Sequence, residues 1–179
     1  MNEMMLPIRL VDCDGRHAGA IRGIFNEVIE NSTALYEYSP RSMEVVERWV
    51  ATRLAESRPI LGAEDASGRL LAFASYGPFR PFPAYHYTVE HSVYVAADSR
   101  GRGLGRLLLS ALIERATSRD VRVMVGGIDA ANAASISLHR SLGFNHAGTI
   151  REAGWKFGRW LDLEFWQRVL PGPASPTDG

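Results

Sequence analysis

The sequence has little of what marks secreted or membrane proteins. Its 179 residues include one cysteine, Cys13, so no intramolecular disulfide can form, and a single thiol suits a reducing compartment. No apolar run approaches the roughly 20 residues of a membrane-spanning helix, and the N-terminus lacks the basic start and apolar core of a signal peptide. We therefore expect a cytoplasmic protein with no membrane partner.

Net charge and metal-binding patterns are also missing. Twenty basic and 20 acidic residues cancel, so electrostatics does not favour nucleic acid as a partner. The five histidines show no ligand spacing such as His-Glu-x-x-His, so we expect no metal. The length suits one domain over residues 1–170, and the Pro- and Gly-rich stretch 171–179 reads as a flexible C-terminal tail.

Hydrophobic periodicity and turn residues predict eleven elements. Helices are expected from Asp12 or Asp14 to about Glu30, after Ser42, after Gly103, and between Asp129 or Asn132 and Gly143. Strands are expected at 6–11, 59–63, 70–76, 88–95, 121–128, 145–156 and 158–170. The order is that of a mixed α/β domain, in which a helical crossover makes the strands at 88–95 and 121–128 parallel.

Two of these segments carry side-chain patterns that matter below. The helix after Ser42 is expected to bury an apolar stripe of Val45, Val46, Trp49, Val50 and Leu54. The strand 88–95 alternates, with Glu90 on the face opposite its valines. Between the strands, 77–85 contains three prolines and is expected to be irregular.

The turn "RGRGLG", Arg100 to Gly105, follows a strand and opens a helix, where free backbone N–H groups and the helix dipole favour an anion. A Walker A loop needs Gly-Lys-Ser/Thr, and here Arg106 and Leu107 follow Gly105. The dinucleotide fingerprint needs Gly-x-Gly-x-x-Gly, which the spacing does not meet. A coenzyme A pyrophosphate loop and a structural turn with spare glycines remain.

Arg100 to Gly105 matches the Arg/Gln-x-x-Gly-x-Gly/Ala loop of acyl-coenzyme A-binding proteins, and "NAASISLHRSLGF", Asn132 to Phe144, matches a second motif of the same superfamily. The chain therefore resembles the GCN5-related N-acetyltransferase (GNAT) superfamily. The resemblance implies a GNAT fold, an α/β domain with a mixed, mostly antiparallel sheet, a central splayed parallel strand pair and flanking helices.

Two further segments, "TVEHSVYV" and "KFGRWLDLEFWQ", resemble the phosphinothricin and methionine sulfoximine N-acetyltransferase group. That group acetylates the α-amino group of small amino acids and analogues by direct transfer in a ternary complex. The resemblance also implies acetyl-CoA as co-substrate and a homodimer, for which Trp155 and Trp160 are candidate interface residues.

The same resemblance implies where the co-substrate binds. Its pantetheine arm is expected beside the 93–95 segment, its pyrophosphate at the glycine turn, and further contacts at the start of the following helix. The expected residues are Val93, Tyr94, Val95, Arg100, Gly101, Arg102, Gly103, Leu104, Gly105, Arg106, Asn132 and Ser135. Helix capping is the alternative role for Asn132.

Two residues are candidates for proton transfer. An α-ammonium group must lose a proton before it attacks a thioester, and Glu90 is the expected base, acting directly or through water, with a buried ion pair as its alternative. His139 stands where many family members have a tyrosine suited to protonate the leaving thiolate. Imidazole could do the same, or His139 could contact coenzyme A or fill space.

The acceptor site rests on weaker patterns. Arg80 is a candidate partner for a substrate carboxylate. Phe82 and Tyr85 are expected to form aromatic walls around it, with closure of the core edge as their alternative role. Tyr36, Phe157 and Gly158 are expected to close the pocket from the other side. Two other functions remain open: acetylation of peptide or protein N-termini or other amines, and a coenzyme A-binding sensor without catalysis.

Overall fold

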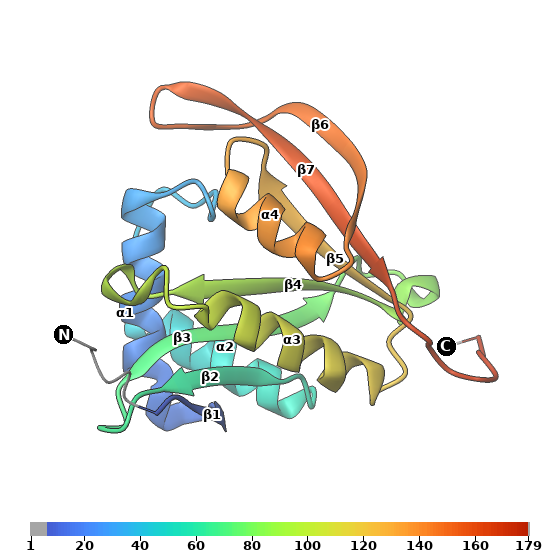
Figure 1. The fold of residues 1–179 in the computed structure, drawn as a ribbon, viewed down its shortest axis with the longest axis horizontal. Helices are drawn as coiled ribbons and strands as arrows, with labels where there is room; N and C mark the ends of the chain where they lie inside the picture. Colours follow the sequence, from blue (N-terminus) through green and yellow to red (C-terminus); the bar gives the residue numbers. More distant parts are fainter. Residues whose placement is uncertain (1–6, 179) are drawn as a thin grey trace.

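Seven strands and four α-helices follow one another in the predicted order in a computed structural model, which describes residues 7–178 (Figure 1). The helices are α1 (Ala18–Asn31), α2 (Met43–Ala55), α3 (Leu104–Thr117) and α4 (Ala133–Ser141). The strands are β1 (Arg9–Asp12), β2 (Ile60–Glu64), β3 (Leu70–Pro78), β4 (Thr88–Val95), β5 (Val123–Asp129), β6 (Asn145–Lys156) and β7 (Arg159–Val169).

The strands form one sheet in the order β1-β2-β3-β4-β5-β7-β6. Every neighbouring pair is antiparallel except β4 and β5, which are parallel as the α3 crossover requires. The mixed sheet with a central parallel pair confirms the predicted fold class.

Two apolar cores lie on opposite faces of this sheet. Leu108 and Leu112 of α3 pack on one face, with Leu71 and Met124 of the sheet among their partners. On the other face, α1 and α2 cover an aromatic cluster in which the rings of Phe25 and Phe73 are 4.9 Å apart. The alternation of β4 is confirmed, because its valines belong to the α3 face and Tyr94 to the α1–α2 face.

The helix starts follow from local side-chain caps. The Ser42 hydroxyl accepts from the Val45 N–H at 3.3 Å, as predicted for α2. Asp14 caps a short 3-10 turn, Gly15–His17, that leads into α1. The predicted start of the first strand at Leu6 lies outside the described residues.

Two sequence-based expectations were wrong in detail. In α2, Val45 and Leu54 are each 46% exposed, whereas Val46 and Val50 are buried and Arg53 points to the sheet in place of Leu54. The 77–85 segment is not irregular throughout, because β3 continues through Gly77 and Pro78 in register with β4, and Pro83–Tyr85 forms a 3-10 turn.

The segment after β7 has no regular secondary structure as far as residue 178. Its Thr177 N–H donates to the Tyr87 hydroxyl at 3.0 Å, and Arg122 donates to the Pro171 carbonyl at 2.8 Å. The flexibility of this tail stays a prediction. Among residues 7–178, no helix combines the length and apolarity needed to cross a bilayer.

Candidate active site

A cavity of about 740 Å³ opens where β4 and β5 separate. The two strands are in register only from Thr88 to Glu90 on β4 and from Val123 to Val125 on β5. Beyond these residues, the β5-facing edge of Val93 to Val95 is open to an extended ligand, which can add itself as a strand would. This divergence is the predicted splay, and it fits a pantetheine arm.

The glycine turn borders one end of this cavity. Gly101 and Gly103 have φ of +76° and +79°, a left-handed conformation that side chains with a Cβ adopt at a cost. Gly103 caps α3, and the Leu107 N–H donates to its carbonyl, so the N–H groups of the residues before Leu107 face outward. The turn therefore offers the curled backbone and helix N-terminus that a pyrophosphate needs.

The arginines of the turn are placed differently from one another. Arg100 lines the cavity and pairs with Glu27 of α1, while its Nε donates to the Val95 carbonyl at 3.3 Å. Arg106 donates to the Ser141 hydroxyl on α4 at 2.6 Å, and Arg102 is exposed. Two of the three arginines, Arg100 and Arg106, are thus held in place by neighbouring residues.

At the start of α4, Asn132 performs the capping role given as its alternative. Its side-chain oxygen accepts from the Ser135 N–H at 3.1 Å. Both residues also line the cavity beside the open edge of β4. Capping and a contact to a bound pantetheine arm are compatible, since the cap uses the Asn132 oxygen.

His139 lies deeper and is bonded through both ring nitrogens. Its Nδ1 is 2.7 Å from the Ser135 carbonyl, which can only accept, so Nδ1 carries the proton. Its Nε2 then accepts from the Nε2 of His91 at 3.2 Å, which leaves the buried His91 Nδ1 without a partner among the described residues. Burial lowers the pKa of His139 and that of His91, the latter to about 3.

Glu90 lies where the paired part of β4 ends, and its carboxylate borders the cavity. Its Oε1 lies over Gly127, where an added Cβ would stand 3.2 Å away. Burial raises the pKa of Glu90, and nearby Arg80 lowers it. A carboxylate with a raised pKa at a cavity wall is suited to accept a proton.

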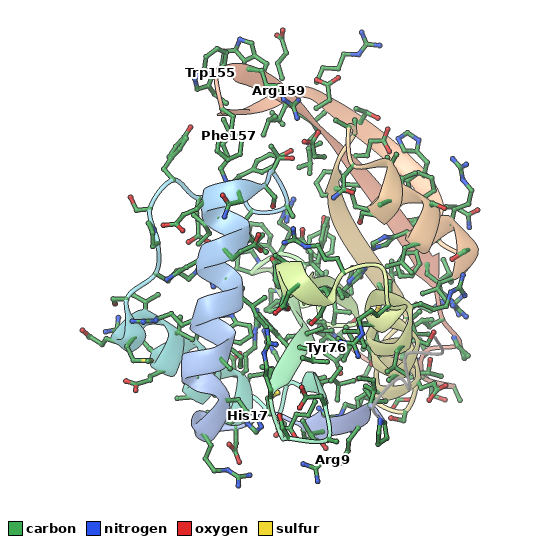
Figure 2. All side chains as sticks on the ribbon, turned by 60° about the vertical axis from the view of Figure 1, so that its left-hand side comes forward. Arg9, His17, Tyr76, Trp155, Phe157 and Arg159 are labelled. Atoms are coloured by element: carbon green, nitrogen blue, oxygen red, sulfur yellow. The ribbon has the colours of Figure 1, made fainter. Side chains whose placement is uncertain are left out.

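The acceptor residues are only partly brought together. Tyr36 lines the cavity, with its hydroxyl buried and without a partner among residues 7–178. The Arg80 guanidinium stacks on Phe79, and its Nη1 lies 3.9 Å from Oε2 of Glu90. Arg80 is not among the described residues that line the cavity. Phe82, 65% exposed, and Tyr85 lie on the outer surface, as does Phe157, which Figure 2 shows at the end of the β6–β7 hairpin. Gly158 occupies the turn of that hairpin with φ of +73°.

Two buried charges order the 32–36 side of the cavity; the sequence named Asp129 only as a possible helix cap and did not single out Lys156. Asp129, at the end of β5, accepts from the Thr33 hydroxyl and from Arg159 at 3.1 Å. Lys156, the one lysine of the chain, donates to the carbonyls of Ile29, Ser32 and Leu35 at 2.7, 2.8 and 2.7 Å. Together they fix the 32–36 segment that lines the cavity.

Comparison with known proteins agrees with this geometry. The family described as Acetyltransferase (GNAT) domain matches residues 14–165. The L-methionine sulfoximine/L-methionine sulfone acetyltransferase of Pseudomonas aeruginosa is 50% identical over 157 residues, which cover 87% of this chain and 91% of that protein.

Two solved structures share the fold over nearly the whole chain. A protein of Acinetobacter baylyi superposes with a TM-score of 0.96 at 53% identity, covering 98% of this chain and 99% of that one. A phosphinothricin acetyltransferase of Sinorhizobium meliloti, in complex with acetyl-CoA, gives a TM-score of 0.90 at 36% identity and covers 98% and 95% of the two chains. The chain belongs to the GNAT family of acetyltransferases, the family that its motifs predicted.

Proposed function

We propose that this protein acetylates the α-amino group of small amino acids or analogues, of the methionine sulfoximine, methionine sulfone or phosphinothricin type. Acetyl-CoA is the donor, in a ternary complex. The observation that carries the proposal is one continuous cavity with the glycine turn at one end and Glu90 at the root of the strand divergence. Relatives of high identity whose names state these substrates support the choice of acceptor.

The residues present fit acetyl-CoA. The positive-φ glycines and the N-terminus of α3 would hold its pyrophosphate, and the open edge of Val93 to Val95 would hold its pantetheine arm. When bound, acetyl-CoA supplies the thioester carbonyl that the amine attacks. A β4 backbone N–H facing the divergence can donate to that carbonyl oxygen as negative charge develops.

The acceptor nitrogen loses two protons, one from the ammonium group before attack and one after it, and Glu90 takes the first, directly or through water. The new bond joins that nitrogen to the acetyl carbon, the carbon–sulfur bond breaks, and the thiolate sulfur is then protonated. His139 stays our proposed proton donor to sulfur. Because Nδ1 holds its proton against the Ser135 carbonyl, His139 would have to take up on Nε2 the second proton released by the acceptor nitrogen, and then turn this N–H from His91 to sulfur.

The other predicted contacts stay proposals as well. Tyr36, Arg80, Phe82, Tyr85, Phe157 and Gly158 are proposed to surround the acceptor. We also propose a homodimer whose interface is formed by the exposed aromatic side chains of Trp155, Phe157 and Trp160. Dimer formation would pack these side chains against a second copy of the chain.

The cellular setting follows the same reasoning. We propose a reducing, cytoplasmic location for a single domain over residues 1–170. Burial raises the pKa of the Cys13 thiol to about 12, which suits a packing role rather than reactivity. Acetylation removes the ammonium charge of an amino-acid analogue, so resistance to such compounds would be one consequence.

A substrate panel tests the proposal. Thiol release from acetyl-CoA is measured with L-methionine sulfoximine, L-methionine sulfone, phosphinothricin, unmodified amino acids and a short peptide with a free N-terminus. We expect the highest kcat/KM among the free amino acids and analogues. A higher kcat/KM for the peptide would overturn the proposed acceptor class.

A further inference from the structure

Arg53 turns inward from α2 onto the same sheet face as Glu90. It continues the buried stripe of that helix, three residues after Val50 and seven after Val46, and both of these valines are buried. Its guanidinium lines the cavity. Arg53 is thus a charged side chain at a position where a helix of this kind normally places an apolar one.

The guanidinium rests on backbone that a side chain would otherwise cover. A Cβ added at Gly77 would lie 2.3 Å from Arg53 Nη1 and 2.8 Å from Nη2. Gly77 is the direct cross-strand partner of Glu90 in the β3–β4 register, so a Cβ at Gly77 would share a face with the Glu90 side chain. The missing side chain of Gly77 therefore lets the Arg53 cation lie over the residue that pairs with the proposed base, on the same face of the sheet.

Within residues 7–178 the guanidinium lies 5.4 Å from the centroid of the Trp49 ring, but it makes no ion pair. The described ion pairs and hydrogen bonds include none from the Arg53 side chain, and its Nε is buried without an acceptor. Asp129, which also lines the cavity, is by contrast paired with Arg159. Burial and the nearby Arg58 lower the pKa of Arg53, and Glu56 raises it without forming an ion pair. A partly desolvated cation with no ion-pair partner is costly, which points to an anion supplied by a ligand.

We propose that Arg53 binds the α-carboxylate of the acceptor. This inference rests on the proposed function. A guanidinium binds a carboxylate through two parallel hydrogen bonds, and in an α-amino acid one carbon separates the carboxylate from the amine. A carboxylate held over Gly77 therefore leaves the amine within reach of Glu90, the neighbouring residue across the strand pair.

The proposal assigns the acceptor carboxylate to Arg53 and not to Arg80. The Arg80 guanidinium stacks on Phe79 and donates to the Phe79 carbonyl at 2.7 Å, outside the described lining of the cavity. Arg53 borders the cavity itself. The assignment also predicts a preference against peptides, because the first residue of a peptide has an amide where a free amino acid has its carboxylate.

The test compares an acid with its amide. kcat/KM is measured for L-methionine sulfone and for its carboxamide, with the native chain, Arg53→Gln and the control Arg48→Gln. Arg48 is on the same helix and pairs with Glu44 in solvent. We expect Arg53→Gln to lower kcat/KM for the acid about 100-fold, mostly through a higher KM, and to change kcat/KM for the amide little. Arg48→Gln should leave both unchanged.

Gly77→Ala provides a second variant that keeps the charge. The three atoms nearest to its Cβ all belong to the flexible end of Arg53, so the chain should fold while the guanidinium moves. We expect the acid-to-amide preference to fall about tenfold with an unchanged KM for acetyl-CoA. A raised acetyl-CoA KM in either variant would assign Arg53 to the donor and overturn the inference.

Two further outcomes distinguish failure of this inference from failure of the proposed function. If Arg53→Gln lowers kcat/KM equally for the acid and for the amide, or leaves kcat/KM for the acid unchanged, then Arg53 does not bind the carboxylate. The proposed function stands in either case. If the native chain binds acetyl-CoA but acetylates no free amino acid or analogue, the proposed function fails, and this inference fails with it.

Discussion

The two ends of the cavity are built in different ways. The end where we propose that the donor binds is built from backbone: two positive-φ glycines, the N-terminus of α3 and the open edge of β4. The end where we propose that the acceptor binds is built from side chains that come from distant parts of the chain, with Arg53 on α2, Glu90 on β4 and Asp129 at the end of β5.

The difference has a chemical reason. A pyrophosphate and a chain of amides are recognised by N–H and carbonyl groups, which a short contiguous turn and one strand can present. A small amino acid must be oriented by its charges, which requires a cation and a base at a set separation. We therefore expect changes at the donor end to alter acetyl-CoA binding and changes at the acceptor end to alter turnover or acceptor KM.

Glu90→Gln should give the largest effect, since it removes the proposed base without changing the shape of the side chain. We expect kcat to fall by about 10²- to 10⁴-fold, with the KM for acetyl-CoA unchanged. Steady-state thiol release measures both, and Glu47→Gln, on the exposed face of α2, is the control. A Glu90→Gln enzyme with native kcat across the pH range would remove Glu90 as the base.

Gly103→Val tests the donor end. A β-branched residue at φ of +79° strains the turn by roughly 1–3 kcal/mol, so we expect acetyl-CoA to bind about 10- to 100-fold more weakly. Calorimetric titration with coenzyme A measures this. Gly23→Ala is the control, because no atom lies near an added Cβ there and its φ is not positive. Native affinity in Gly103→Val would argue against a pyrophosphate site at this turn.

Lys156→Met tests the acceptor wall. Three carbonyls lose their shared donor, so the free energy of unfolding should fall by about 3 kcal/mol, measured by urea denaturation. The 32–36 segment should also shift, raising the acceptor KM about tenfold while the acetyl-CoA KM stays the same. Equal changes in both KM values would contradict the separation of the two ends.

Arg80→Gln should give the smallest effect, a shift in the pH profile. Activity requires ionised Glu90, so it rises with pH through the pKa of this residue. Arg80 lowers that raised pKa, and its loss should move the acidic limb of kcat/KM to higher pH. Arg48→Gln should leave the limb in place. An unmoved limb in Arg80→Gln would mean that Arg80 does not act on the base.

The sequence predicted the elements around the proposed donor site better than those around the proposed acceptor site. The element order and the parallel strand pair follow from local periodicity and from the crossover, and the structure confirmed both. The glycine turn is contiguous, so its motif could be recognised without knowing the fold. Asn132 could be named as a cap for the same reason, since capping involves residues three apart.

The acceptor end depends on contacts between residues far apart in sequence. The pairing of Gly77 with Glu90, which makes room for Arg53, follows from a strand register that no local pattern specifies. A signal for Arg53 was present in the helical spacing from Val46, but Leu54 was preferred because it is apolar. Lys156 could have been noticed as the one lysine in a chain that otherwise uses arginine.

The difference between the two ends is tested most directly by a crystal structure with coenzyme A and L-methionine sulfone bound together. We expect pantetheine between β4 and β5, pyrophosphate at Arg100 to Gly105, the acceptor carboxylate on Arg53 and its amine facing Glu90. An acceptor whose carboxylate lies away from Arg53, or whose amine lies beyond reach of Glu90, would contradict the arrangement.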